Sequence, residues 1–313
     1  MPDLVTIGET MAAFIPESGL PIQKAPGFHM RIAGAESNTA IGVARLGHFA
    51  GWISRLGDDS FGEYILDTLQ KEGVDTSRTV TDALHSTGIM FKQPNQENAT
   101  QVYYYRDNSA ATFLSASSID YDYLTSAKVL HVTGITPILS QSCMECINKA
   151  IDIAHDNRIL VSFDPNIRLK LWRNKDYRPL LTNLISRSNI VLLGLSEASV
   201  LYETDDIQQI TDLIFSHPRV QYVAVKNGAL GAWVCTRDER HFVDPIPCNC
   251  IEPVGAGDGF NAGFIHGILE RRDIKTCGLY GGIAGALATE TYGDTGGYPT
   301  LERLQQMEEK YGQ

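Results

Sequence analysis

The chain has 313 residues and a mass of 34.4 kDa, which favours one large domain or two of modest size. Apolar residues make up 43% and charged residues 20%, values that exclude a disordered, collagen-like or coiled-coil chain. The net charge of −11 argues against nucleic acid as the main partner, and no apolar run approaches the ~18 residues of a membrane span. Because the first residues lack the basic start of a signal peptide, we expect a cytoplasmic protein.

The N-terminal part combines two helical patterns with several short strands. Apolar and β-branched runs predict strands at 4–9, 11–15, 28–32, 52–56, 88–92 and 100–106. Helices are predicted at 36–46 and 61–71, ended by Gly47 and Gly73. The segments at about 11–33 and 88–106 are not interleaved with helices, so we expect them to form a small separate β element.

From Lys128 onward, strand and helix patterns alternate. Strands are predicted at 129–132, 159–163, 190–193 and 222–225, and helices at 143–155, 177–186 and 207–215. Such alternation indicates a parallel sheet covered by helices on both faces. We therefore predict an α/β fold, a doubly wound and mostly parallel sheet with a small β-sheet lid, as a single domain over residues 1–313.

The most informative stretch runs from Glu252 to Phe264 and contains Gly255-Ala256-Gly257-Asp258. The apolar pattern after it predicts a helix that begins at this turn. A turn of this kind points backbone N–H groups and the positive end of the helix dipole at an anion. Because Asp258 adds negative charge, it suits a phosphate site when it accepts a proton from an attacking hydroxyl.

Two alternatives stay open for this turn. Residues 257–262 fit the dinucleotide pattern GxGxxA, although that fingerprint usually lies in the first βα unit. Asp258 could instead be the N-cap of the following helix. No GxxxxGK[ST] motif occurs, which excludes a P-loop enzyme.

Two other patterns suggest different chemistry. The sequence around Ser196 nearly matches the nucleophile elbow of α/β hydrolases, with His241 or His266 as the required imidazole. Cys143 and Cys146 have the spacing of a redox pair or zinc site. They stand in a helical pattern, however, where cysteine often behaves as a small buried hydrophobe.

Several motifs together resemble the ribokinase-like (pfkB) carbohydrate kinases. They are the 255–260 turn, Gly34, Asn38, Ala44, the 46–47 and 55–62 segments, and Lys226-Asn227-Gly228 with Gly231. They run in family order through the whole chain. The resemblance implies a Rossmann-like domain with a β-sheet lid, which agrees with the predicted organisation. It also implies the use of ATP and Mg²⁺, and a homodimer or assembly of dimers formed through the lid.

Within that family, four segments resemble 2-keto-3-deoxygluconate kinases. They are residues 34–38 (GAESN), 104–110 (YYRDNSA), 164–168 (DPNIR) with Trp172, and 293–294 (GD) ahead of 297–299. A sugar acid is the implied substrate, phosphorylated to its 6-phospho product, and Arg suits its carboxylate through paired hydrogen bonds. A kinase of a neutral sugar, of fructokinase or ribokinase type, shares the same turn and is the alternative.

The resemblance assigns roles to individual residues. Asp258 is the implied catalytic base, and the N–H groups of Gly255, Ala256 and Gly257 hold the γ-phosphate. The implied sugar contacts are Gly34, Ala35, Glu36, Asn38, Met90, Tyr104, Arg106, Arg168, Asp258 and Asp294. The implied nucleotide contacts are Asn166, Arg168, Ser196, Lys226, Gly228, Gly231, Gly255, Ala256, Gly257 and Gly282. Glu197 would reach Mg²⁺ through water, although Gly194 replaces the family's usual Asn.

Ordinary structural roles compete with some of these assignments. Glu36 could be the first-turn acid of its helix, and Arg168 could pair with Asp164 or cap a helix. Alternation along a strand places Tyr104 and Arg106 on one face and Tyr105 on the other. Tyr104 and Arg106 could therefore face the site together, or could serve cross-strand packing and a solvated charge.

Overall fold

The computed structural model describes residues 1–17, 20–94 and 100–312 of the chain. The strands are β1 (Leu4–Ile7), β2 (Met11–Pro16), β3 (Phe28–Ala33), β4 (Ala50–Gly57), β5 (Thr79–Asp82), β6 (Ile89–Pro94), β7 (Thr100–Tyr105), β8 (Val129–Thr133), β9 (Leu160–Asp164), β10 (Ile190–Gly194), β11 (Tyr222–Lys226), β12 (Ala232–Cys235) and β13 (Arg240–Val243). The α-helices are α1 (Ala35–Arg45), α2 (Ser60–Lys71), α3 (Tyr121–Thr125), α4 (Thr136–Leu139), α5 (Gln141–Asp156), α6 (Leu169–Trp172), α7 (Arg178–Ser186), α8 (Leu195–Tyr202), α9 (Ile207–Phe215), α10 (Ala256–Leu269), α11 (Ile274–Ala288) and α12 (Leu301–Tyr311).

The central sheet has nine strands in the order β13-β12-β11-β10-β9-β8-β1-β4-β5. All strands from β11 to β5 run parallel, while β12 and β13 add an antiparallel edge. In the middle, Leu4 of β1 is paired with Ala50 on one side and Val129 on the other. The predicted doubly wound, mostly parallel sheet is therefore confirmed.

Alternate side chains of the central strands enter two separate hydrophobic clusters. On β1, Val5 and Ile7 pack into the cluster that includes α5, α7, α8 and α9. Leu4 packs into the cluster on the opposite face, with α1, α2, α10 and α11. Because both faces are covered, the strands are nearly continuous apolar runs, which is why they could be recognised in the sequence.

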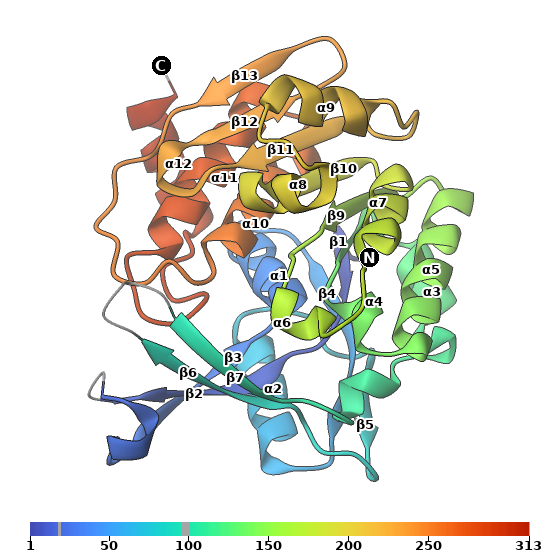
Figure 1. Cartoon of the computed structure of the whole chain (residues 1–313), viewed down its shortest axis with the longest axis vertical. Coiled ribbons are helices and arrows are strands. Elements are labelled where there is room, and N and C mark those ends of the chain that lie inside the picture. The colour runs from blue at the N-terminus through green and yellow to red at the C-terminus, as the bar shows by residue number, and fades with distance from the viewer. Residues whose placement is uncertain (18–19, 95–99, 313) are drawn as a thin grey trace.

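A second sheet of four strands, in the order β3-β2-β6-β7, lies beside the central one (Figure 1). Strands β2 and β6 are parallel, and the other two pairs are antiparallel. The small β element expected from residues 11–33 and 88–106 is therefore present. Its residues 18–19 and 95–99 lie outside the described part of the chain.

The predicted element ends differ from the observed ones by a few residues. Gly47 and Gly73 follow α1 and α2 with φ values of +90° and +80°, a backbone conformation that favours glycine and ends a helix. The pattern did not predict the strands β5, β12 and β13 or the helices α3, α4, α6, α8, α11 and α12. Within the described residues, no helix has the length and apolarity needed to cross a bilayer.

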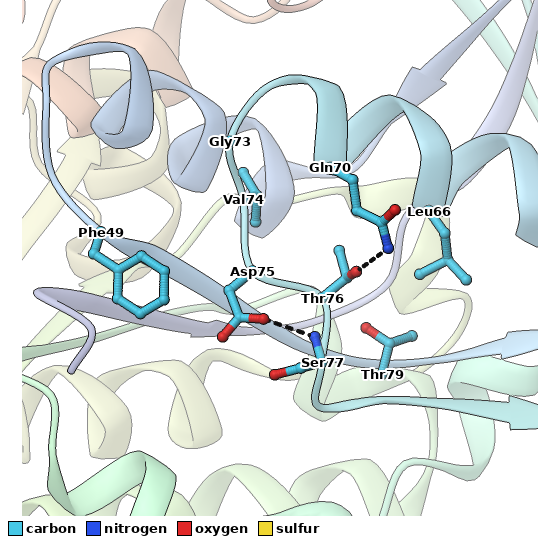
Figure 2. A pocket seen from close by; sticks show the side chains of 9 residues that line it. All are labelled: Phe49, Leu66, Gln70, Gly73, Val74, Asp75, Thr76, Ser77 and Thr79. Atoms are coloured by element: carbon cyan, nitrogen blue, oxygen red, sulfur yellow. Dashed lines mark hydrogen bonds between the residues drawn. The ribbon is translucent and has the colours of Figure 1, made fainter.

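A hollow of about 550 Å³ opens beside the C-terminal end of α2 and the start of β5. Figure 2 shows that its polar side chains bond to their neighbours: Gln70 donates to Thr76 Oγ1, and the Asp75 carboxylate accepts from the Ser77 N–H. Asp75 also accepts from the Tyr123 hydroxyl. These bonds order a loop, so the hollow is a weaker candidate for a functional site than the cavity described next.

Candidate active site

A cavity of about 1310 Å³ lies where the carboxyl ends of β9, β10 and β11 face the small sheet. In open α/β sheets, ligands bind at this end of the strands. Every residue that the sequence assigned to the sugar, the nucleotide or the metal lines this cavity. These residues come from positions 34 to 294 in the chain, so the fold gathers the whole predicted set at one place.

The Gly-rich turn forms the N-terminus of α10 and opens into the cavity. Gly255 is the N-cap with φ +85°, and a Cβ added there would lie 2.0 Å from the Asp294 carbonyl oxygen. Only glycine fits, because both the backbone conformation and the close contact exclude a side chain. The Tyr298 hydroxyl donates to the Gly255 carbonyl at 2.8 Å and fixes the turn.

Both alternative interpretations of this turn are wrong. Helix α10 begins at Ala256, so Asp258 stands inside its first turn and is not the N-cap. The dinucleotide fingerprint requires a strand that leads directly into the helix. Here residues 244–255 separate β13 from α10.

The Asp258 carboxylate lies at the base of the cavity, between two asparagines. Asn38 Nδ2 donates to its Oδ2 at 2.8 Å, and Asn166 Nδ2 approaches Oδ1 at 3.5 Å. Burial raises the pKa of Asp258 to about 7, with further raising by Asp164 and Asp294 against lowering by the Asn38 hydrogen bond and Arg168. A carboxylate with this pKa can accept a proton near neutral pH.

Two buried oxygens near Asp258 have no hydrogen-bond partner among the described residues. They are Oδ1 of Asn38 and Oδ1 of Asn166. Buried polar atoms are nearly always paired, so an unpaired one requires an explanation. Because both asparagines line the cavity, a bound molecule with hydroxyl donors would satisfy them.

Lys226 and Asp164 form an ion pair beneath the turn. Lys226 Nζ donates to Asp164 Oδ2 at 2.9 Å and to Asn261 Oδ1 at 3.0 Å, and Asn261 Nδ2 donates to the same Asp164 oxygen at 2.7 Å. This attraction, with the hydrogen bond from Asn261, lowers the pKa of Asp164 although burial opposes it. A Cβ on Gly257 would lie 3.8 Å from Lys226 Nζ, so the ammonium group stands directly beside the turn.

Glu197 occupies the start of α8, the next helix along the cavity. Its Oε2 accepts from the Gly194 N–H at 2.6 Å and its Oε1 accepts from the Ile167 N–H at 2.7 Å. Burial and the nearby Asp164 charge raise the pKa of Glu197. The Asp164 and Glu197 carboxylates repel each other, and a divalent cation would relieve that repulsion.

Glu36 also lines the cavity and is buried. Its Oε1 accepts from the Thr133 and Thr136 hydroxyls, each at 2.7 Å, and burial raises its pKa. A Cβ on Gly8 would fall 2.2 Å from its carboxyl carbon, so Gly8 makes room for this side chain. Glu36 does stand in the first turn of α1, as the alternative interpretation has it, and its carboxylate also lines the cavity.

The small sheet contributes Tyr104 and Arg106, which share one face as the alternation predicted. Tyr105 lies on the other face and is 64% exposed. Arg106 is buried and donates from Nε to Glu9 Oε2 at 2.7 Å, so it is not a solvated charge. Glu9 also accepts from the Ser109 hydroxyl at 2.6 Å.

Lys92 also faces the cavity from the small sheet, and it pairs with the buried Asp294 carboxylate. Sequence reasoning missed Lys92, Glu9 and Asn261. Period-two alternation could have found Lys92, since it shares a strand face with Met90. Glu9 stands at the carboxyl end of a strand predicted to be buried, and this position could have marked it as a site residue.

The remaining predicted residues line other parts of the same cavity. Ser196 stands in the first turn of α8, Gly228 and Gly231 flank the turn after β11, and Gly282 lies on α11. Arg168 is exposed at the rim, and no described carboxylate lies within ion-pair distance of it. Its suggested pairing with Asp164 is wrong, because Lys226 takes that place. Arg168 does occupy the N-cap position of α6, although its side chain makes no capping hydrogen bond.

The other chemical hypotheses fail on geometry. For a hydrolase, Ser196 would need an imidazole, but His241 pairs with Glu239 and His266 with His48, and neither lines the cavity. Cys143 and Cys146 are buried on α5, and burial raises their thiol pKa values to about 11 and about 12. Such thiols are inert at neutral pH, as expected of small core residues.

Residues 1–301 match the pfkB family carbohydrate kinases. The chain belongs to this family. It is 36% identical to the 2-dehydro-3-deoxygluconokinase of Bacillus subtilis (strain 168), with 96% of this chain and 94% of that protein covered. It is 31% identical to the 5-dehydro-2-deoxygluconokinase of Geobacillus kaustophilus (strain HTA426), with 93% and 88% covered.

Among solved structures, the fold is similar to a putative ribokinase II from E. coli in complex with ATP and Mg²⁺. The TM-score is 0.92 at 25% identity, and the match covers 99% of this chain and 100% of that one. This agreement makes the fold ribokinase-like, as the sequence motifs implied. The protein is therefore a carbohydrate kinase built on that fold.

Proposed function

We propose that this kinase transfers the γ-phosphate of ATP to a hydroxyl of a sugar acid, and that 2-keto-3-deoxygluconate is the substrate, giving the 6-phospho product. The observation that carries the reaction is the buried Asp258 carboxylate at the N-terminus of α10, with a pKa of about 7. The kinship with two kinases of deoxygluconates supports the substrate class.

In the proposed reaction, Asp258 acts as the general base. The hydroxyl oxygen of the sugar attacks the γ-phosphorus while its proton passes to an Asp258 carboxylate oxygen. The bond from phosphorus to the β–γ bridging oxygen breaks, and ADP leaves with that oxygen. Asn38 holds the carboxylate in place through its 2.8 Å hydrogen bond.

The phosphate groups fit the N-terminal turn of α10. The N–H groups of Gly255, Ala256 and Gly257 lie at the positive end of the helix, and Lys226 adds a positive charge beside them. These donors would hold the γ-phosphate and the charge that grows on it in the transition state. The N–H groups and Lys226 would thus offset the negative charge of Asp258, which by itself would repel the phosphate.

The carboxylate pair Asp164 and Glu197 fits a Mg²⁺ ion bound through water. Each oxygen of Glu197 already accepts one backbone N–H, and its second lone pairs can accept from metal-bound water. When bound, Mg²⁺ neutralises the β- and γ-phosphates. The walls formed by Ser196, Gly228, Gly231 and Gly282 would hold the nucleoside through backbone and packing contacts.

The cationic groups around the sugar end support an acidic substrate. Arg106 and Lys92 enter from the small sheet, and Arg168 approaches from the rim. Arg106 and Lys92 are balanced by Glu9 and Asp294, whereas Arg168 has no described carboxylate partner. We infer that Arg106 and Arg168 together bind the sugar carboxylate, with Tyr104 as a neutral donor.

We further propose that residues 1–313 form one kinase domain in which the small sheet is a lid over the sugar, and that lids pair between two subunits. The outer face of this sheet carries Tyr103 and Tyr105, which are 40% and 64% exposed. Pairing would cover these rings and the strand edges. Light scattering at micromolar concentration should give a dimer or an assembly of dimers, and a monomeric mass would contradict this.

The substrate proposal is tested by measuring ADP release with ketodeoxygluconate, 5-dehydro-2-deoxygluconate, gluconate, fructose, ribose and adenosine side by side. We expect the highest kcat/KM with ketodeoxygluconate. A clear preference for fructose or ribose would defeat the sugar-acid assignment while leaving the kinase reaction in place. No turnover of any sugar would contradict the proposed reaction itself.

A further inference from the structure

A cluster of imidazoles and carboxylates lies at the C-terminal end of α10, the helix whose N-terminus forms the catalytic turn. His266 stands in its last turn, Glu270 follows the helix, and His48 reaches them from the loop between α1 and β4. The helix has 14 residues, so its two ends are ~20 Å apart. This cluster is therefore separate from the nucleotide and sugar cavity.

The three side chains converge on one point. His48 Nε2 lies 2.8 Å from His266 Nδ1 and 3.9 Å from Glu270 Oε1, and all three ligand atoms lie within 4.8 Å of one another. Around a tetrahedral zinc ion with bonds of ~2.0–2.1 Å, neighbouring ligand atoms are ~3.3 Å apart. A shift of about half an ångström between the two rings would make room for such an ion.

A carboxylate also lies near Nδ1 of His48, the ring nitrogen that does not face His266. Its Nδ1 lies 3.8 Å from Asp3 Oδ2, and Asp3 is fixed by the Phe49 N–H and by Lys128. A carboxylate behind a ligating imidazole favours the tautomer that leaves the other nitrogen free for a metal. Burial lowers the pKa of both His48 and His266.

Some charged groups near the cluster favour a bound cation and others oppose it. Asp3, Glu270 and the negative end of α10 favour a cation, whereas Lys128 and Arg272 oppose it. In the metal-free chain, one proton shared by the two facing nitrogens explains their 2.8 Å separation. When a metal takes that position, the shared proton moves to the outer nitrogen of the ring that carried it, His48 Nδ1 or His266 Nε2, and the total number of protons on the pair stays the same.

We propose that His48, His266 and Glu270 form a binding site for a borderline divalent transition metal such as Zn²⁺, with water as the fourth ligand. Two imidazoles and one carboxylate suit Zn²⁺ and Co²⁺, whereas Mg²⁺ prefers oxygen ligands alone. The ion would tie the C-terminal end of α10 to the loop that leads into β4. It would stabilise the fold without taking part in phosphoryl transfer.

The test uses Co²⁺ as the probe and the full chain in excess Mg²⁺, which occupies oxygen-only sites. We expect about one Co²⁺ per chain, with the visible absorption of a tetrahedral ion, and a higher thermal midpoint. Glu270→Gln and His48→Gln should each weaken Co²⁺ binding by at least ~10-fold, since even partners of metal ligands contribute that much. Glu270 has a half-exposed side chain, so its substitution should leave folding intact.

His241→Gln is the matched control, because it removes a surface imidazole that pairs only with Glu239 among the described residues. This variant should bind Co²⁺ as the wild type does. Equal affinity in the wild type, Glu270→Gln and His48→Gln would overturn the proposal, as would absence of binding in excess Mg²⁺. A thiolate-to-cobalt charge-transfer band would also overturn it, since that band would place the ion on the exposed Cys248 and Cys250.

Discussion

Arg106 donates from Nε to Glu9 at 2.7 Å, which joins the small sheet to the end of β1 across 97 positions of the chain. The pair is buried, so both charges were taken out of water to form it. Such a pair is costly to break from one side, because the remaining charge is then uncompensated. Any test of Arg106 as a substrate ligand must separate this structural role from recognition.

We predict that Arg106→Ala raises KM for ketodeoxygluconate ~30- to 4,000-fold, the effect of losing a contact worth ~2–5 kcal/mol, with KM for ATP nearly unchanged. Arg106→Lys should recover only part, since an ammonium group cannot make the planar paired contact. Steady-state kinetics with each substrate varied in turn provide the measurement.

The double variant Glu9→Gln/Arg106→Met is the control, because it removes both charges and leaves no buried carboxylate unpaired. If Arg106 binds the substrate carboxylate, KM for ketodeoxygluconate stays high in the double variant. Recovery of a normal KM would mean that Arg106 acts only through the structure of the small sheet.

Lys92 and Asp294 make a second buried contact between the small sheet and the body of the protein. We expect Lys92→Met to lower the free energy of unfolding by ~3–5 kcal/mol, because Asp294 is left charged and buried. The double variant Lys92→Met/Asp294→Asn should restore most of this loss. Urea denaturation of the wild type, the two single variants and the double variant gives the coupling free energy between Lys92 and Asp294. Additive effects on the free energy of unfolding would show that the two residues act independently.

Gly255 and Gly257 should respond differently to alanine. At Gly255 a side chain meets the Asp294 carbonyl and a φ of +85°, so Gly255→Ala should be both less stable and inactive. At Gly257 a Cβ meets nothing closer than 3.8 Å, so Gly257→Ala should fold normally but bind ATP more weakly. Calorimetry and ATP titration would check both.

Gly73→Ala is the control for backbone strain alone. Gly73 has a φ of +80° but no atom within 4 Å of an added Cβ, and it lies outside the cavity. The Gly73→Ala substitution should lower the free energy of unfolding by ~1–2 kcal/mol and leave kcat unchanged. A similar loss of stability in Gly73→Ala and Gly255→Ala would mean that the Asp294 contact adds nothing.

The raised pKa of Asp258 predicts that this catalytic group lowers the stability of the folded protein near neutral pH. An unfolded Asp ionises near pH 3.9, whereas the folded one ionises at about 7, so the folded state binds more protons between these values. Stability due to this group therefore falls as pH rises from about 4 to 7. Asp258→Asn should melt at a higher temperature than the wild type at pH 8, with a smaller difference at pH 5.

Much of this site could be predicted from the sequence, because its residues follow recognisable signals. Asp258 stands in a Gly-rich helix start, and Tyr104 and Arg106 obey strand alternation. Glu9 and Lys92 stand at positions that strand patterns could have marked, but their roles come from partners about 100 and 200 positions away, Arg106 and Asp294. No local pattern reveals such pairings.

The fold was predictable for a related reason. Strands buried on both faces are continuous apolar runs, and β8 to β11 were recognisable from that signal alone. The edge strands β5 and β13 and the neighbouring β12 have only four residues each, and β5 and β13 carry mostly exposed or half-buried side chains. Their pairing depends on neighbours in the sheet, which a local pattern does not contain.

The central claim is that Asp258 accepts the proton of the attacking hydroxyl, and the turnover of Asp258→Asn tests it most directly. The variant keeps the shape of the side chain and can still accept the Asn38 hydrogen bond. With ketodeoxygluconate and ATP both saturating, kcat should fall at least ~10²-fold while the affinity for ATP is retained. Turnover close to that of the wild type would contradict the assignment of Asp258 as the base.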